Sequence, residues 1–337
     1  MSPRVRTESG GAKSGGPAAV GAPRRPASVA ALLLAVALAA IPGCSLKRMA
    51  VKSLGNSIAA GGDVFTSDDD PELVRDALPF GLKTLESLLA IVPDHKPLLL
   101  AACQGYTQYA FAFVQTEADL VEASDYPRAV ELRERALRLY LRARGFGLRG
   151  LERGYRGISD QLKRQPAAAA ARIKTRDLPL LYWTAAAWGS AINLGKDRPD
   201  LAADLDAVRA LMDRGLALNE AFDAGALHEA LIVLETLPAM MGGSIPRARE
   251  HFKRAVELSK GAAVSPYVTM ASSVSVTTQN RGEFEELLGK ALEIDPDRDV
   301  SRRLATLVLQ RRARELLRRE DELFLESDTT KVGGPEK

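Results

Sequence analysis

Apolar and polar residues follow one another along most of this chain with the spacing of an α-helix. Between positions 200 and 219, apolar residues recur at steps of three and four, at Leu201, Leu205, Val208, Leu211, Met212 and Leu216. Side chains at these steps share one face of a helix, which can pack against a core. Similar patterns predict helices over 71–92, 97–113, 126–144, 224–237, 246–260, 283–294 and 299–326. The chain is therefore predicted to be all-α, with about a dozen helices in one domain.

The segment Leu178–Leu194, LPLLYWTAAAWGSAINL, contains both tryptophans of the chain and no charged residue. A helix that is apolar on most of its circumference is buried on most of it. The small residues between Trp183 and Trp188 let neighbouring backbones approach, and the large rings fill the remaining space. We expect a central helix whose tryptophans belong to the core. The alternative is that one ring lines a ligand cavity.

Polar residues followed by proline mark several helix starts. Asp70 precedes Pro71, and Ser244 stands two residues before Pro246, so we expect both to cap helices. Asp299 is expected to cap the long helix that ends near Glu326. The segment 266–278 is rich in β-branched residues, which is a weak strand signal, but its place between helices predicts a helix.

The stretch from Gly145 to Gly157 combines glycine with arginine, and we expect an irregular segment there. Its positive charge could form an anion site. Acidic residues, among them Glu131, Glu134 and Glu152, are interleaved with the bases, so a solvated face is the preferred interpretation.

Charge and composition exclude some functions. The formal net charge is +3, but residues 1–43 hold five bases and one acid, which leaves 41 bases and 42 acids in the remainder. This near-neutral balance argues against a broad nucleic-acid-binding surface. Neither cysteines nor histidines have the spacing of zinc ligands, and HE at 228–229 lacks the second histidine of a zincin motif because position 232 is Ile. His228 is expected to be a hydrogen-bonded core or groove residue.

The N-terminus has the features of an export signal. Residues 1–28 are rich in Gly, Pro, Ala and Ser and are expected to be disordered. Arg24 and Arg25 precede the apolar run Val29–Ile41, which is too short for a spanning helix of about 20 residues. The run ends in Ile-Pro-Gly-Cys44, which resembles a bacterial lipobox. An ordinary secretory signal with an incidental cysteine is the alternative.

The lipobox resemblance implies cleavage after Gly43 and transfer of acyl chains such as palmitate to Cys44. Each buried CH₂ contributes roughly 0.8 kcal/mol, so two or three chains would anchor the protein stably. Ser45, rather than Asp, after the cysteine favours the outer over the inner membrane. Cys103 would then have no partner in an oxidising space, and we expect it to be a buried small residue.

These observations divide the chain into four regions. We expect a signal peptide with a disordered extension over 1–43, an anchor and linker over 44–70, a helical domain over 71–326 and a disordered tail over 327–337. Within the domain, Gly81, Leu85, Leu88 and Pro93 are similar to the second helix of a tetratricopeptide repeat (TPR). The matches are unevenly spaced, which indicates diverged TPR-like helix pairs rather than a regular solenoid.

Several sequence blocks together resemble a known family. They are LLLAACQGYTQYAFAF, LYWTAAAWG, GGSIPRAREHFKRAVELSKG, FEELLGKALEIDPD and RRLATLVLQRRARELLRREDELF. With the lipobox, this order is similar to the TatT family, the T component of tripartite ATP-independent periplasmic (TRAP) transporters. The similarity extends from about Cys44 to Glu326.

The resemblance implies a non-catalytic periplasmic lipoprotein without cofactor or metal. Members of the family resemble trimers with a pore through each subunit. The implied partners are the substrate-binding P subunit and a small ligand of hydrophobic character. Trp183, Trp188 and Tyr106 are the candidates for the wall of a ligand channel.

Two other functions are alternatives. A TPR-like scaffold lipoprotein for envelope assembly would share the anchor and the fold, and neighbouring genes would distinguish it. An exported hydrolase is disfavoured because the chain lacks a G-x-S-x-G motif and its histidines lack triad-like neighbours.

Overall fold

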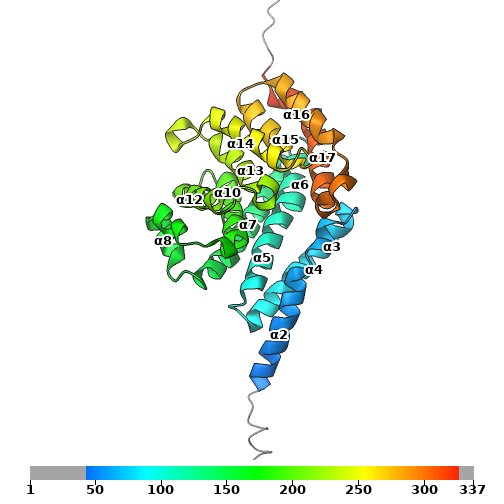
Figure 1. The fold of residues 1–337 in the computed structure, drawn as a ribbon. Coiled ribbons are helices and arrows are strands. Elements are labelled where there is room, and N and C mark those ends of the chain that lie inside the picture. Colours follow the sequence, from blue (N-terminus) through cyan, green and yellow to red (C-terminus); the bar gives the residue numbers. More distant parts are fainter. Residues whose placement is uncertain (1–42, 326–337) are drawn as a thin grey trace, which may run out of the picture. The chain divides into compact units, whose positions relative to one another are not determined.

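The computed structural model describes residues 43–325, with side chains from Arg48 onward except those of Ala60 and Asp63. Within this range the chain is helical and contains no strand, which confirms the predicted all-α class (Figure 1). The described residues from Arg48 onward belong to one compact unit. The predicted signal peptide up to Pro42, the side chain of Cys44 and the tail lie outside the described residues. The four predicted regions therefore stay a prediction.

The first half of the described chain supplies the central helix α10 and the helices that pack around it. They are α2 (Gly43–Ala60), α3 (Asp63–Thr66), α4 (Pro71–Ile91), α5 (Lys96–Tyr109), η1 (Ala110–Gln115), α6 (Thr116–Val121), α7 (Tyr126–Glu152), α8 (Ile158–Arg164), α9 (Pro166–Ala171), η2 (Thr175–Asp177) and α10 (Leu178–Leu194). The η1 segment is a single π-helical turn that continues α5 into α6. No helix in the described range combines the length and apolar character needed to cross a membrane.

The second half continues with shorter helices. They are α11 (Pro199–Ala202), α12 (Leu205–Leu218), η3 (Phe222–Gly225), α13 (Ala226–Glu235), η4 (Ala239–Met241), α14 (Ile245–Leu258), α15 (Ser265–Met270), η5 (Ala271–Ser275), α16 (Arg281–Glu293), η6 (Pro296–Arg302), α17 (Arg303–Arg318) and α18 (Glu320–Leu323). Helices α4 and α5, α13 and α14, and α15 and α16 pack as neighbouring pairs, which is consistent with TPR-like pairing. The β-branched segment after Ser265 is helical, as predicted.

The predicted caps at Asp70 and Ser244 are confirmed. The carboxylate of Asp70 accepts a hydrogen bond from Leu73 N at 2.9 Å, and the Ser244 hydroxyl accepts one from Arg247 N at 3.4 Å. Each bond satisfies a backbone donor that the first turn of a helix leaves free. The prediction for Asp299 was wrong: its backbone is extended, it caps only the short η6 turn through Ser301, and the long helix begins at Arg303.

Helix α10 has the predicted bounds and the predicted central position. It packs along α7 and α5 on one side and against α12 on another. Ala185, Ala187 and Ala191 are fully buried at these contacts. Because alanine adds only a methyl group, the neighbouring helices approach closely and the apolar surface of α10 is removed from water.

The Gly/Arg stretch is not irregular up to Glu152, because α7 continues through it. A Cβ atom at Gly147 would stand 2.2 Å from Thr184 Oγ1 of α10, and one at Gly150 would stand 2.8 Å from Leu180 Cδ2. The glycines therefore let α7 touch α10 at backbone distance. This tertiary packing offsets the helix propensity that each glycine costs, which is about 1 kcal/mol.

Cys103 is a free, buried thiol on α5, as predicted. Burial raises the pKa of this thiol to about 12, while Thr184 and the backbone near Gly147 oppose the shift. A thiol with such a pKa holds almost no reactive thiolate at neutral pH. Cys103 is therefore a packing residue where α5, α7 and α10 meet.

The helical array closes back on its own beginning. Helix α17, the last long helix, packs against α3 and α4 (Figure 1). Arg311 of α17 pairs with Glu72 of α4 at 2.9 Å, and Arg303 donates to Ser67 O at 3.3 Å. The two halves of the chain are thus joined twice, by the continuous chain between α12 and α13 and by this returning helix.

Candidate functional site

Trp188, one of the predicted channel residues, is fully buried in the core. Its Nε1–H donates to Asp204 Oδ2 at 3.2 Å, and the Arg144 guanidinium lies 5.2 Å from its ring centroid. Lys163 Nζ also lies 3.3 Å from Asp204 Oδ2. The indole is therefore fixed by packing, by a hydrogen bond and by a cation–π contact.

Tyr106 is also nearly inaccessible, with 2% of its surface exposed. Its ring stacks on Phe146 with centroids 5.9 Å apart, and its hydroxyl donates to Glu86 Oε1 at 2.9 Å. Burial, followed by the hydrogen bond to Glu86, raises the pKa of this hydroxyl to about 12. Tyr106 and Trp188 belong to two different hydrophobic clusters, so the structure does not bring these two residues together.

Trp183 is the one of the three predicted residues that keeps appreciable accessible surface. It meets the Tyr182 ring edge-on at a centroid distance of 5.0 Å, and Tyr182 in turn lies 5.4 Å from the Phe222 ring of η3. We call Tyr182, Trp183 and Phe222 the aromatic cluster. Along the same face of α10, Ala186 and Ser190 are also half-buried.

A carboxyl group accompanies the aromatic cluster. Glu229 of α13 is half-buried and accepts a hydrogen bond from Thr269 Oγ1 at 3.3 Å. Burial is the main cause that raises the pKa of Glu229, and Asp223 adds to the shift. The pKa of Tyr182 is likewise raised, first by burial and then by the charges of Glu229 and Asp223. The Tyr182 hydroxyl therefore lies within the electrostatic influence of both acids.

The backbone that carries the cluster is strained. Asp223 and Ala224 have φ values of 46° and 53°, in the left-handed region that residues with a Cβ atom rarely adopt. Asp223 forms an ion pair with Arg302 of η6, which helps to hold this turn. Strain of this kind costs of order 1–3 kcal/mol and persists where the surrounding structure imposes it, often beside functional sites.

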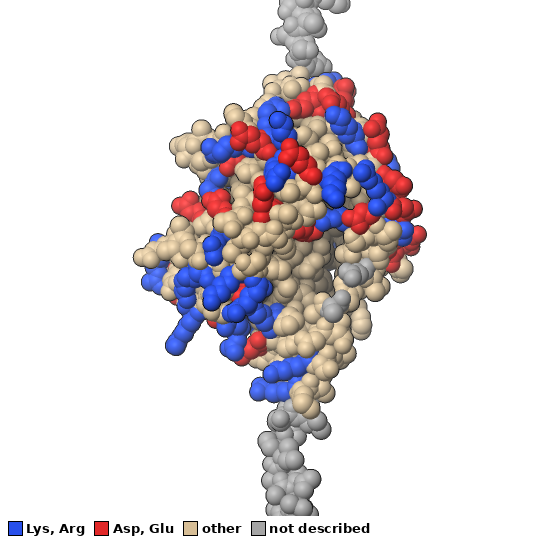
Figure 2. Space-filling model, in the orientation of Figure 1, with Lys and Arg blue, Asp and Glu red and all other residues tan. Residues whose placement is uncertain are grey.

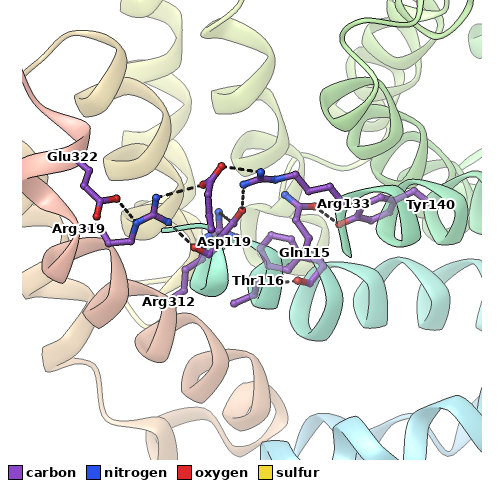
Figure 3. A network of polar contacts seen from close by, with 10 residues as sticks. Gln115, Thr116, Asp119, Arg133, Tyr140, Arg312, Arg319 and Glu322 are labelled. Carbon is purple, nitrogen blue, oxygen red and sulfur yellow. Dashed lines mark hydrogen bonds and ion pairs between the residues drawn. The ribbon is translucent and has the colours of Figure 1, made fainter. Parts of the chain in front are cut away.

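A network of ion pairs closes α17 onto α6 (Figure 3). Arg133 Nη1 lies 2.8 Å from Glu122 Oε1, and Arg312 Nη2 lies 3.1 Å from Asp119 Oδ2. Arg319 Nη1 donates to Asp119 O at 2.5 Å, and its Nη2 lies 3.4 Å from Glu122 Oε2. We call these five residues the α6–α17 clasp. Its partners are up to 200 positions apart in sequence.

The clasp continues into the core through η1. The Tyr140 hydroxyl, fully buried on α7, donates to Gln115 Oε1 at 2.7 Å, and Thr116 Oγ1 donates to Phe111 O at 2.9 Å (Figure 3). The Arg312 guanidinium lies 5.4 Å from the centroid of the Phe111 ring. Single π-turns often occur at functional sites, and here the π-turn places polar groups beside the closing helix.

A cavity of about 190 Å³ lies beside the clasp, between α4, η1, α6 and α17. Its walls include Phe113, Leu120 and Val308 together with the Glu72–Arg311 pair. This volume is below the roughly 300–1,000 Å³ of sites for drug-sized ligands. The cavity therefore has room for a small molecule only.

We expect the clasp to weaken in acid. The Arg133 hydrogen bond is the main cause that holds the pKa of Glu122 below its ordinary value of 4.5, with Arg319 adding to it. A carboxylate with a lowered folded-state pKa stabilises the fold above its ordinary pKa, and this contribution is lost as the pH falls through the folded value. Glu122→Gln should therefore lower the free energy of urea unfolding by about 1 kcal/mol at pH 7.

The cost of Glu122→Gln should shrink as the pH is lowered below 4.5. Glu131→Gln is the matched control, because Glu131 pairs only with Arg128 and is 69% exposed. It should cost little at any pH. A cost for Glu122→Gln that is the same at acid and neutral pH would contradict the prediction.

His228 is hydrogen-bonded, as predicted, but its partners were not foreseen. Its Nδ1 lies 2.8 Å from His251 Nδ1, and its Nε2 lies 3.1 Å from Glu220 Oε1. The Arg254 guanidinium donates one hydrogen bond to each carboxylate oxygen of Glu220, at 2.7 and 2.8 Å. Burial lowers the pKa of both histidines. The arrangement joins the histidines to each other and to a carboxylate, and it contains no nucleophile.

No group of three or more His, Cys, Asp or Glu side chains in the described residues could hold a metal ion. The aromatic cluster offers apolar contact surface with one nearby carboxyl group, which suits reversible binding of a small molecule. Sequence reasoning found Trp183 but missed Tyr182, Phe222 and the role of Glu229. The available signal was the polar pair His228-Glu229 inside the otherwise apolar helix ALHEALIVLE.

Comparison with known proteins gives two findings. A family model described as TAtT, TRAP transporter T-component, matches residues 67–324. A protein of Treponema pallidum (strain Nichols), named only as an uncharacterized protein, is 29% identical over 303 residues, which cover 84% of this chain and 94% of that protein. The family match includes all the helices from α4 to α17 that build the aromatic cluster and the clasp.

Proposed function

This chain belongs to the family of TRAP transporter T components, and we propose on that premise that it is a non-catalytic lipoprotein that docks the P subunit and assists transfer of a small ligand. Family membership places it in association with a TRAP transporter of the cell envelope. The match over residues 67–324 is the observation that carries the proposal. The further proposals are a periplasm-facing location, an anchor at Cys44 and a homo-oligomeric, trimeric state.

The aromatic cluster supports the ligand-transfer part of the proposal. Tyr182 and Glu229 keep accessible surface, yet protein surrounds both groups closely enough for burial to dominate their pKa values. Both polar groups therefore lie in poorly hydrated surroundings. Trp183 and Phe222 add half-buried apolar area beside them. Transfer of a small hydrophobic molecule from water onto such apolar area is favourable.

The surroundings of Trp183 suit a ligand contact better than those of the other two predicted residues. Trp188 and Tyr106 are already fully packed, so a ligand could reach them only if the core opened. Trp183 has surface to offer without any rearrangement. We therefore assign the ligand contact to Trp183, together with Tyr182 and Phe222.

Docking of the P subunit is tested directly. The mature chain, immobilised through its C-terminal tail, should capture the P subunit of a TRAP transporter encoded in the same genome. An unrelated periplasmic binding protein serves as the control for general stickiness. Transient complexes of this kind often have dissociation constants near the micromolar range, so binding is measured by calorimetry as well as by capture. Recovery of an envelope-assembly machine without any P subunit would contradict the proposal.

A further inference from the structure

We propose that a basic surface formed by the end of α7, α8 and η2 binds the anionic headgroups of a phospholipid membrane and holds the helical unit against the bilayer. The surface consists of exposed bases, namely Arg153, Arg156, Lys163, Arg164, Lys174 and Arg176. The inference rests on the part of the proposed function that tethers the chain through Cys44. It adds a second membrane contact that the tether alone does not supply.

The charge of this surface is visible in the space-filling view. Figure 2 shows Lys and Arg side chains gathered over the region of α8, with few acidic side chains among them. Over α16 and α17 both signs are mixed. Mixed charges largely cancel beyond a Debye length of about 8–10 Å, whereas a surface of one sign attracts an oppositely charged partner.

Two of the three acidic residues of the segment 149–177 are held by hydrogen bonds within the protein. Both oxygens of Glu152 are occupied, because they accept from Gly157 N at 2.7 Å and Ser159 N at 2.8 Å. Asp177 is buried and accepts from the Tyr155 hydroxyl at 2.6 Å. Asp160 is exposed, 3.8 Å from Arg164. Arg153 also pairs with Asp94, and Lys163 pairs with the buried Asp204. Acids therefore neutralise part of the surface, but residues 149–177 hold eight bases against three acids, so its net charge stays positive.

The tether indicates a membrane as the occupant. Cys44 stands four residues before Arg48, and four residues span at most about 14 Å. The bilayer would therefore lie close to the start of the described side chains in α2. Arg48 and Lys52 there are exposed bases, and Met49 is an exposed apolar residue. In Figure 1, α2 lies at the bottom of the ribbon and α8 at mid-height on the left, while α16 and α17 lie in the upper part.

The electrostatic attraction of a few basic residues is strong enough to hold a tethered protein against an anionic membrane. A basic residue near an anionic membrane surface strengthens binding about fivefold, and the attraction falls off within a Debye length. A tether raises the effective concentration of the membrane, so weak contacts become populated. Even a few bases at the bilayer would then fix the orientation of the helical unit.

The experiment uses the chain from Ser45 onward, which contains the compact unit and lacks the lipidated cysteine. It is mixed with sedimenting vesicles of phosphatidylcholine alone or of phosphatidylcholine with one quarter phosphatidylglycerol. Binding to the anionic vesicles should be at least ~10-fold stronger and should be lost at about 0.5 M salt. Far-ultraviolet circular dichroism checks that every variant is folded.

Two variants that lose the same number of positive charges distinguish an effect of this surface from an effect of the net charge of the protein. The test variant is Arg153→Gln, Arg156→Gln, Arg164→Gln and Lys174→Gln. The matched control, on α14, α16, η6 and α17, is Lys253→Gln, Lys290→Gln, Arg298→Gln and Arg314→Gln. The test variant should bind anionic vesicles at least ~10-fold more weakly, and the control should bind as the parent does.

Three results would overturn the proposal. One is the absence of any preference for anionic vesicles, and another is an equal loss in both variants. The third is a test variant that keeps vesicle binding but no longer binds the P subunit, which would assign the surface to an acidic protein.

The lipid tether is tested in a separate experiment: Cys44→Ser in the full chain should abolish labelling by a palmitate analogue. Because the protein in the vesicle assay contains no lipidated cysteine, failure of the proposed membrane contact and failure of the proposed lipid anchor are distinguishable.

Discussion

Trp188→Ala should lower the free energy of unfolding by about 3–5 kcal/mol, the usual cost of truncating a buried tryptophan. The indole is fully buried, so its removal leaves a cavity between α10 and α12 and forfeits the dispersion contacts of its walls. It also removes the donor to Asp204 and the ring beneath Arg144. Urea denaturation followed by circular dichroism measures the loss.

Trp183→Ala is the matched control for this substitution, one turn earlier on the same helix. Its side chain keeps accessible surface, so the loss of stability should be less than half as large. It should instead weaken binding of an apolar fluorescent probe such as N-phenyl-1-naphthylamine, which Trp188→Ala should leave unchanged when the protein is folded. Equal destabilisation by both substitutions would mean that Trp183 is also a core residue and would remove it from the proposed ligand contact.

Gly147→Ala should destabilise the protein by about 1–3 kcal/mol, because the new methyl group has no room. Its Cβ would stand 2.2 Å from Thr184 Oγ1 and 3.0 Å from Cys103 Sγ. Relief requires α7 to move away from α10 and α5, whose side chains at this point are buried. The gain in helix propensity, about 1 kcal/mol, offsets only part of the cost. Thermal and urea unfolding both report the change.

Gly145→Ala provides a control with the opposite sign. Gly145 lies in the same helix, and a Cβ atom there would meet nothing within 4 Å. Alanine should therefore stabilise α7 by up to about 1 kcal/mol. If both substitutions stabilise the protein, the close approach of α7 to α10 does not limit the packing, and the structural explanation for the glycine-rich end of α7 is wrong.

The local sequence was sufficient to predict several structural elements. The uncharged run Leu178–Leu194 has no polar face to offer water, so its position at the centre followed from composition and period alone. Asp70 and Ser244 cap helices because their side chains reach backbone donors three residues ahead. These features depend on neighbours in sequence, and a pattern along the chain contains the information that determines them.

Features that depend on distant partners were not predictable in the same way. The glycines of α7 indicated a break, since propensity is local, whereas Thr184 and Leu180 supply the reason for a continuous helix. The partners of the α17 arginines were not predictable either. Their pairing with Asp119 and Glu122 depends on how α17 meets the end of α6, which the hydrophobic period does not encode.

The candidate site shows the same division. Trp183 was identified because tryptophan is rare in this chain and stands in an apolar run. Phe222 and Glu229 lie 39 and 46 positions after Trp183, in separate helices, and only the fold brings them near Tyr182. A carboxyl group in an otherwise apolar helix is the one sequence signal that could have indicated its role.

The return of α17 to the start of the domain has a consequence for biogenesis. The ribosome makes Asp119 and Glu122 long before Arg312 and Arg319, so through most of synthesis Arg133 is the one clasp arginine that can pair with these carboxylates. Contacts of such high sequence separation form slowly, because the entropy cost of closing a long loop comes before the contacts can stabilise the chain. A nascent chain that stops before residue 303 would therefore have a complete α10 but would lack the contacts of α17 with α3, α4 and α6. Such an unfinished chain exposes surface that chaperones and proteases recognise.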